Sequence, residues 1–142
     1  MDFKKNSILI VEDHDSTREG LASFLGGEYT CFAAASAEEA MRLMGARNFN
    51  LVLTDINLPG ASGLELCRLV RRMSLGTVVI AMTAMTDNEC RESALREGAL
   101  YYIEKPFELD KLLAWIRSAL GCQAMARVRR SPEQRTQLVE RR

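Results

Sequence analysis

Five short apolar segments alternate with longer segments of helical periodicity, and this alternation limits the possible folds more than any other feature of the sequence. The apolar segments are expected to be strands at residues 7–11, 29–35, 49–55, 77–83 and 100–104. Strands that alternate with helices form a parallel sheet covered on both faces, and right-handed crossovers leave few topologies open. The sequence therefore predicts a (βα)5 fold of the α/β class, with a doubly wound five-stranded parallel sheet in a three-layer sandwich.

The helical segments carry their own start and stop signals. Helices are expected at residues 15–27, 37–47, 63–73, 87–98 and from Glu108 to about residue 120. Ser36 with Glu39 three residues later is a capping box, and Gly98 is expected to end the fourth helix. The stripe expected to face the core from the last helix consists of Leu109, Leu112, Leu113, Ile116 and Leu120.

Charge divides the chain into two unequal parts. Residues 1–120 carry 13 Lys and Arg against 17 Asp and Glu, whereas residues 121–142 carry six Arg and two Glu. We expect a globular domain at residues 1–120, followed at 121–142 by a basic C-terminal tail or linker, or by the start of an output domain. Ser131, Pro132 and Gln134 resemble a helix start. Direct binding of nucleic acid is not expected, because one small arginine cluster without interleaved aromatic residues is a weak signal.

Cysteine spacing and hydropathy indicate the compartment. The four cysteines show no CxxC spacing, which favours reduced thiols over a zinc site or a disulfide framework. No stretch has the length and apolarity of a membrane span, and the N-terminus lacks the apolar region of a signal peptide. We therefore expect a cytoplasmic protein with no membrane partner.

Chemically capable residues follow the predicted strands at the points where these end. Glu12 and Asp13 follow the first strand, and Asp55 ends the third. Thr83 and Ala84 lie at the end of the fourth strand, and Lys105 and Pro106 come after the fifth. Ligands of doubly wound sheets bind beyond the carboxyl ends of the strands. Three acids, a hydroxyl and an ammonium group are thus expected at one edge of the sheet.

Three neighbouring carboxylates repel one another unless a cation lies between them. Mg²⁺ prefers oxygen ligands and takes one or two carboxylates together with phosphate oxygens. Asp13, Asp55 and the backbone carbonyl of Asn57 are candidate ligands, and Glu12 is a candidate through a water molecule. An aspartate can accept a phosphoryl group covalently, and Lys105 and Thr83 would then contact the phosphoryl oxygens.

The segments ILIVEDHDSTREGL, LVLTDINLPGASGLEL, VVIAMTA and YYIEKPFELDKLLAWI resemble the signature segments of the response-regulator receiver domain of two-component signalling. The resemblance covers residues 6 to about 120. It implies the flavodoxin-like strand order 2-1-3-4-5. It also implies that Glu12 and Asp13 are the acidic metal-binding pair, Asp55 the phosphoacceptor, Thr83 the switch hydroxyl and Lys105 the family's lysine.

The same resemblance implies partners and a switch. A sensor histidine kinase or phosphotransfer protein would donate the phosphoryl group with Mg²⁺ bound, Mn²⁺ being a possible substitute. Tyr102 would be the switch aromatic residue, and the bond before Pro106 would be a cis peptide. The face made by the fourth helix, fifth strand and fifth helix would change, controlling an output domain or protein and a homodimer formed on phosphorylation. The fourth helix suits this role, because its apolar face is thin, at Cys90 and Ala94.

Alternative functions remain at this point. A pseudo-receiver that is never phosphorylated would be expected to lack one of the site residues, and none is missing. A phosphohydrolase of the haloacid dehalogenase type needs a second aspartate where this chain has Asn57. An enzyme is therefore not expected, apart from intrinsic autodephosphorylation. His14 is interpreted as a loop residue rather than a ligand, because Mg²⁺ prefers oxygen, and Asn57 and Met85 are positions that tune phosphoryl lifetime in the family.

Overall fold

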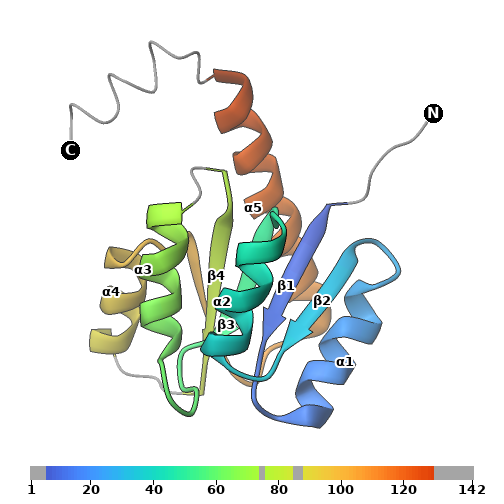
Figure 1. Ribbon diagram of the computed structural model, residues 1–142. Coiled ribbons are helices and arrows are strands. Elements are labelled where there is room, and N and C mark those ends of the chain that lie inside the picture. Colours follow the sequence, from blue (N-terminus) through green and yellow to red (C-terminus); the bar gives the residue numbers. More distant parts are fainter. Residues whose placement is uncertain (1–5, 74–75, 85–87, 130–142) are drawn as a thin grey trace.

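The computed structural model describes residues 6–73, 76–84 and 88–129, without the side chains of residues 88, 89 and 122–129. Five strands and five helices alternate along the chain (Figure 1). The strands are β1 (Ser7–Val11), β2 (Thr30–Ala34), β3 (Leu51–Asp55), β4 (Val78–Thr83) and β5 (Tyr101–Glu104). The helices are α1 (Asp15–Leu25), α2 (Ala37–Ala46), α3 (Gly63–Met73), α4 (Asn88–Arg96) and α5 (Leu109–Arg129).

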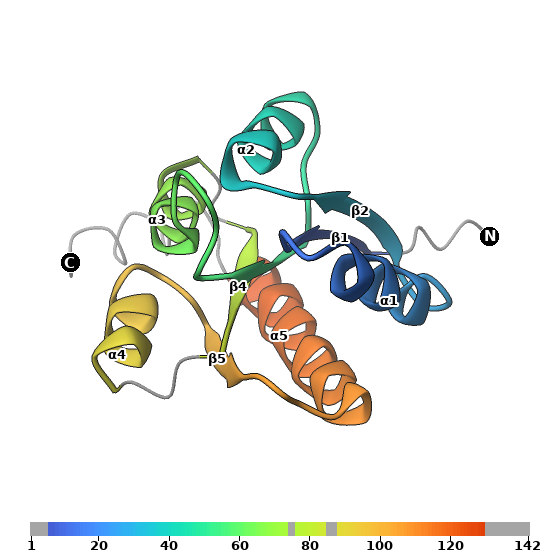
Figure 2. The ribbon, with the colours of Figure 1, turned by 90° about the horizontal axis from the view of Figure 1, so that it is seen from below.

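All strand pairs are parallel, and the sheet has the order β2-β1-β3-β4-β5. The predicted fold class and strand order are therefore confirmed. Helices α1 and α5 cover one face of the sheet and α2, α3 and α4 the other (Figure 2). The sheet thus buries both faces, as expected for a parallel sheet.

Alternate residues of each strand enter two separate cores. Ile8 and Ile10 pack under α1 and α5, whereas Leu9 and Val11 pack under the helices of the opposite face. All five residues of β3 are buried, because this strand lies in the middle of the sheet. A carboxylate at the end of β3 is therefore carried by the most enclosed strand of the molecule.

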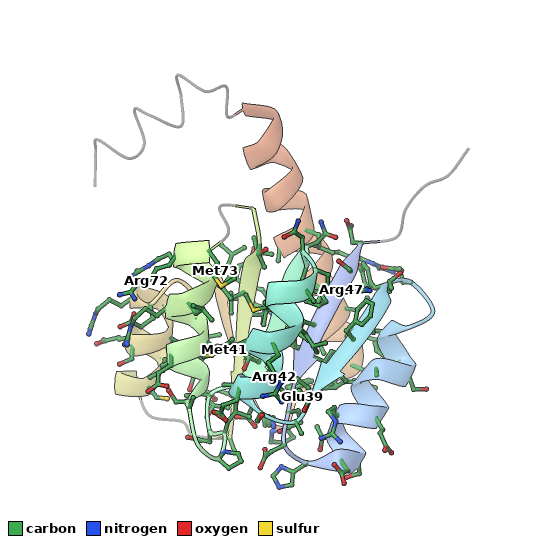
Figure 3. The ribbon with its side chains drawn as sticks, in the orientation of Figure 1. Glu39, Met41, Arg42, Arg47, Arg72 and Met73 are labelled. Atoms are coloured by element: carbon green, nitrogen blue, oxygen red, sulfur yellow. The ribbon has the colours of Figure 1, made fainter. Side chains whose placement is uncertain are left out.

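Local signals in the sequence predict the start of α2 and the turn after α4. Ser36 caps α2 by accepting a hydrogen bond from the Glu39 backbone N–H at 3.1 Å, and the Glu39 carboxylate accepts one from Ala35 N at 3.1 Å. Glu39 lies in the first turn of α2, and Arg47 lies at the other end of the helix (Figure 3). Gly98 follows α4 with φ of 115°, a left-handed conformation that favours glycine.

The structure corrects one residue of the predicted core stripe on α5. Leu112 and Ile116 are fully buried, but Leu109 is 41% exposed, because it is the first residue of the helix and lies beyond the end of the sheet. The helix continues to Arg129, past the predicted boundary at residue 120. The helix start predicted at Ser131–Gln134 and the tuning position Met85 lie outside the described residues. No helix of the described residues is long and apolar enough to cross a membrane.

Candidate functional site

Asp55 lies at the carboxyl end of β3 and is 5% exposed. Its carboxylate accepts two hydrogen bonds, from Asn57 N at 2.9 Å on Oδ1 and from Lys105 Nζ at 2.7 Å on Oδ2. The first bond forms because the chain turns directly after the strand, and the second joins residues 50 positions apart in the sequence. A buried charge needs such partners, so Asp55 is held in a defined orientation.

Glu12 and Asp13 follow β1 at the same edge of the sheet. Glu12 is fully buried, and its Oε1 accepts a hydrogen bond from Lys105 Nζ. Burial raises the pKa of the Glu12 carboxyl, and nearby Asp55 raises it further, while Lys105 acts in the opposite direction. Glu12 Oε2 and Asp13 Oδ1 are buried and have no hydrogen-bond partner among the described residues.

Those two oxygens accept no hydrogen bond, although His14 Nδ1 lies 3.8 Å from the first and 3.5 Å from the second, and they test whether a cation fits. A buried acceptor without a partner is costly, and carboxylate oxygens are preferred ligands of Mg²⁺. The donor set at this edge therefore fits a hard divalent cation.

Lys105 is the one ammonium group that the described residues bring to these carboxylates. Its backbone N–H donates to Thr83 O at 2.7 Å, which ties the segment after β5 to the end of β4. Burial lowers the pKa of Lys105, but the hydrogen bonds to Asp55 and Glu12 outweigh this and raise it above the usual value. The peptide bond between Lys105 and Pro106 is cis, as predicted.

Thr83 ends β4 and is fully buried. The Asn57 side-chain amide donates a hydrogen bond to Thr83 Oγ1 at 3.3 Å, so the loop after β3 reaches the end of the neighbouring strand. Ala84 follows and is exposed. The Thr83 hydroxyl is thus linked to Asp55 through Asn57, whose backbone N–H donates to Asp55 Oδ1.

Tyr102 lies on β5 beside Ala81 and is half-buried against the core under α3 and α4. Burial raises the pKa of the Tyr102 hydroxyl; Cys90 and Glu104 raise it further, and Thr83 lowers it. The Arg91 guanidinium of α4 lies 6.0 Å from the ring centroid. Tyr102 therefore connects the region of Thr83 with α4.

His14 follows the acidic pair in the sequence and precedes the first residue of α1. Its side chain is 73% exposed, with Nδ1 3.5 Å from Asp13 Oδ1 and 3.8 Å from Glu12 Oε2. These three side chains offer ligand atoms within 4.8 Å of one another. The exposure fits a residue at the mouth of the site, and no ion is needed to explain it.

Two glycines, Gly60 and Gly63, position the site. A Cβ on Gly63 would lie 2.2 Å from the Asp55 backbone oxygen, so only glycine lets α3 begin this close to the end of β3. Gly60 has φ of 79°, and the following Ala61 N–H donates to Glu38 Oε1 at 2.8 Å. The Pro59–Gly60 turn is visible in the sequence, but the close approach at Gly63 needs the folded chain to reveal it.

The structure brings Glu12, Asp55 and Lys105 into direct contact, and it joins Asn57 to Thr83. Asp13 lies beside Glu12 with one oxygen unpaired, and Tyr102 reaches the group from β5. This arrangement can hold a cation between carboxylates, present Asp55 as a nucleophile and neutralise negative charge with Lys105.

Comparisons with known proteins agree with this geometry. Residues 8–117 match the family model described as the response regulator receiver domain. The CheY-like receiver domain protein from Methanospirillum hungatei JF-1 has a similar structure, with a TM-score of 0.83 and 32% identity over 86% of this chain and 98% of that one. The response regulator TrrA from Thermotoga maritima, solved in complex with Mg(2+)-BeF, has a TM-score of 0.73 and 31% identity over 80% of this chain and 98% of that one.

Among curated proteins, the chain is similar to the uncharacterized transcriptional regulatory protein YkoG of Bacillus subtilis, with 38% identity over 83% of this chain and 52% of the relative. The chain spans about half or about a quarter of the length of the curated relatives it matches. Because the family model covers most of the sequence, the chain belongs to the family of response regulator receiver domains.

Proposed function

We propose that the chain accepts a phosphoryl group on Asp55 from a histidine kinase or a phosphotransfer protein, in a Mg²⁺-dependent reaction. The observation that carries this proposal is the buried Asp55 carboxylate, held by Lys105 at 2.7 Å beside two acids with unpaired buried oxygens. In the transfer, a bond forms between an Asp55 oxygen and phosphorus while the phosphorus–nitrogen bond of the donor's phosphohistidine breaks. The proton on the other ring nitrogen lets the histidine leave as neutral imidazole.

The metal would be held by Asp13, Asp55 and the backbone carbonyl of Asn57, with Glu12 acting through a water molecule. When bound, Mg²⁺ supplies charge neutralisation and orientation of the phosphoryl oxygens. Mn²⁺ has the same charge and is expected to substitute. The burial of Glu12 supports its place behind the other ligands rather than at the mouth of the site.

Lys105 and Thr83 would bind the phosphoryl oxygens once they arrive. The Lys105 ammonium group already contacts Asp55, so it needs little movement to neutralise the new charge. Thr83 Oγ1 accepts a hydrogen bond from the Asn57 amide, and its O–H would donate to a phosphoryl oxygen. Exposed Ala84 leaves room beside it.

The output would be a change in the face made by α4, β5 and α5. Movement of Thr83 would alter the surroundings of Tyr102, and Tyr102 lies against Cys90 and Arg91 of α4. The change is a shift between two states of the domain, biased by the new charge. The changed face would bind an output domain or a partner protein, or a second copy of the chain after phosphorylation. A cytoplasmic location and the division at residue 120 remain predictions that accompany this proposal.

Incubation with acetyl phosphate and Mg²⁺ tests the acceptor chemistry. We expect intact mass to increase by one phosphoryl group, and we expect no increase for Asp55→Asn or in EDTA. Asp13→Asn is expected to raise the Mg²⁺ concentration needed. A phosphoryl gain that persists in Asp55→Asn, or the absence of any gain with Mg²⁺ present, would contradict the proposal.

A further inference from the structure

The two buried oxygens that accept no hydrogen bond, Glu12 Oε2 and Asp13 Oδ1, both lie beside the same ring nitrogen of His14. His14 Nδ1 is 3.8 Å from the first and 3.5 Å from the second, and the three side chains offer ligand atoms within 4.8 Å of one another. Glu12 is fully buried, and its other oxygen accepts a hydrogen bond from Lys105. Two buried oxygens without a donor and one imidazole nitrogen therefore surround one small volume.

His14 is an unusual residue for its place in the chain. It occupies the N-cap position of α1, but its side chain makes no capping hydrogen bond. Serine, threonine, aspartate and asparagine are preferred at an N-cap, because their side chains accept a hydrogen bond from the first turn of the helix. The imidazole thus does not cap α1, and it lies instead beside the two carboxylates.

The chemistry of this three-residue set favours a transition ion. Mg²⁺ prefers oxygen ligands, whereas Zn²⁺ accepts imidazole together with carboxylates and often takes three protein ligands and a water molecule. Two ligand atoms bound to one tetrahedral Zn²⁺ lie about 3.4 Å apart, which is close to the two distances from His14 Nδ1. Two carboxylates also balance the charge of a divalent ion. The set therefore fits Zn²⁺ better than Mg²⁺.

We propose that Glu12, Asp13 and His14 bind Zn²⁺, and that bound Zn²⁺ keeps Mg²⁺ from the phosphoacceptor site, because both ions need Asp13. The Asp55 carboxylate already accepts two hydrogen bonds, so the zinc site is centred on the acidic pair rather than on Asp55. The binding of Zn²⁺ does not depend on phosphoryl transfer. The competition rests on the proposed function, in which Mg²⁺ uses Asp13.

Nuclear magnetic resonance of the imidazole ring tests the zinc site directly. His14 is the only histidine in the sequence, so its ring signals need no further assignment. We expect about one equivalent of Zn²⁺ to shift the ring nitrogen resonances, and Mg²⁺ to shift them far less. Zn²⁺ bound by cysteine thiols would leave these signals where they are. Ring signals that do not respond to Zn²⁺ would overturn the proposal.

His14→Ser separates the ligand from the fold. Serine is a preferred N-cap, so this variant should keep or raise Tm. Calorimetric titration should show that the ratio of Zn²⁺ affinity to Mg²⁺ affinity falls by at least about tenfold. Asp15→Asn is the matched control, because Asp15 is 81% exposed and pairs with Arg18. Its loss should change the ratio by less than about threefold. An unchanged ratio in His14→Ser would contradict the zinc site.

Phosphorylation by acetyl phosphate and Mg²⁺ tests the competition. Added Zn²⁺ should slow the phosphoryl gain of the unsubstituted chain, and the same slowing of His14→Ser should need about tenfold more Zn²⁺. Equal slowing of both chains, or no slowing of either, would overturn the competition. If the ring signals respond to Zn²⁺ but Mg²⁺ supports no phosphoryl gain, the proposed function fails and the zinc site stands. A Mg²⁺-dependent gain without any response of the ring signals gives the opposite result.

Discussion

Helices α4 and α5 flank the same strand, β5, but they are attached to the domain in different ways. In the described part of α5, four apolar side chains are buried: Leu112, Ile116, Ala119 and Leu120. In the described part of α4, the buried apolar residue is Ala94 alone. Apolar burial sets much of an element's resistance to local opening. The fold therefore gives β5 one firmly packed neighbour and one that can move at a small free-energy cost.

A two-pronged ion pair lies at each of these helices; the pair next to α4 is partly buried and the pair on α5 is exposed. On α4, the Arg68 guanidinium of α3 donates to both oxygens of Glu97, which follows the helix, at 2.9 and 3.1 Å. On α5, Arg117 donates to both oxygens of Glu28 at 2.7 and 3.1 Å. The same chemical link thus occurs in a weakly packed and a strongly packed setting. We expect the ion pair to contribute more to the local stability of α4 than of α5, because few apolar contacts hold α4.

The largest expected effect is the loss of a core side chain from α5. Ile116→Ala removes a fully buried residue and is expected to lower the free energy of unfolding by about 2–5 kcal/mol. Cys90→Ala, on the partly buried face of α4, should change it by less than about 1 kcal/mol. Urea denaturation followed by circular dichroism measures both. Equal losses would show that α4 is packed as firmly as α5.

The second effect is a response of α4 to a phosphoryl mimic. Addition of Mg²⁺ and beryllofluoride should change amide hydrogen exchange in α4 by about tenfold, because Tyr102 connects the site to Cys90 and Arg91. Amides of α5 near Ile116 should exchange as before. The same additions to Asp55→Asn serve as the control. Equal changes in both helices would mean that the whole face moves as one body.

The sequence predicts the part of this comparison that depends on local pattern. The five strands, the Ser36 cap, the turn at Gly98 and the thin apolar face of α4 all follow from neighbouring residues. The grouping of Glu12, Asp55, Thr83 and Lys105 follows from the rule that parallel strands present their carboxyl ends at one edge.

Features that depend on contacts between distant segments could not be predicted in this way. Gly63 is required by the Asp55 backbone oxygen, which only the folded chain brings near it. Leu109 fits the apolar spacing of α5 but lies beyond the end of the sheet, so its side chain stays exposed. The pairing of Arg68 with Glu97 spans 29 residues, and nothing in either local pattern selects that partner.

A smaller effect comes from breaking the two ion pairs. Arg68→Gln should increase hydrogen exchange at the carboxyl end of α4, whereas Arg117→Gln should leave the inner amides of α5 protected. Neither substitution should lower Tm as much as Ile116→Ala, because ion pairs at or near the surface contribute less to global stability than a fully buried apolar side chain. Exchange measured at low and high salt provides a control, since salt should weaken both pairs. Opening of α5 in Arg117→Gln would refute the assignment of its stability to the apolar core.

The smallest expected effect is the pH dependence of the same two pairs. Arg68 lowers the pKa of Glu97, and Arg117 lowers the pKa of Glu28 to about 2. A carboxyl whose pKa is lower in the folded state stabilises the fold above its unfolded pKa, and this contribution is lost as pH falls through the folded pKa. For Glu28 that window extends from its usual 4.5 down to about 2.

Other carboxyls titrate in the same range, so the measurement compares the unsubstituted chain with each variant at every pH. The difference in free energy of unfolding between the unsubstituted chain and Arg117→Gln should shrink as pH falls from 4.5 to about 2. Hydrogen exchange should show no opening of α5. The difference between the unsubstituted chain and Arg68→Gln should also shrink below pH 4.5. For this variant the difference should be seen mainly as faster hydrogen exchange in α4. Identical local exchange for the two variants would mean that the ion pairs, rather than the unequal apolar packing, set the mobility of these helices.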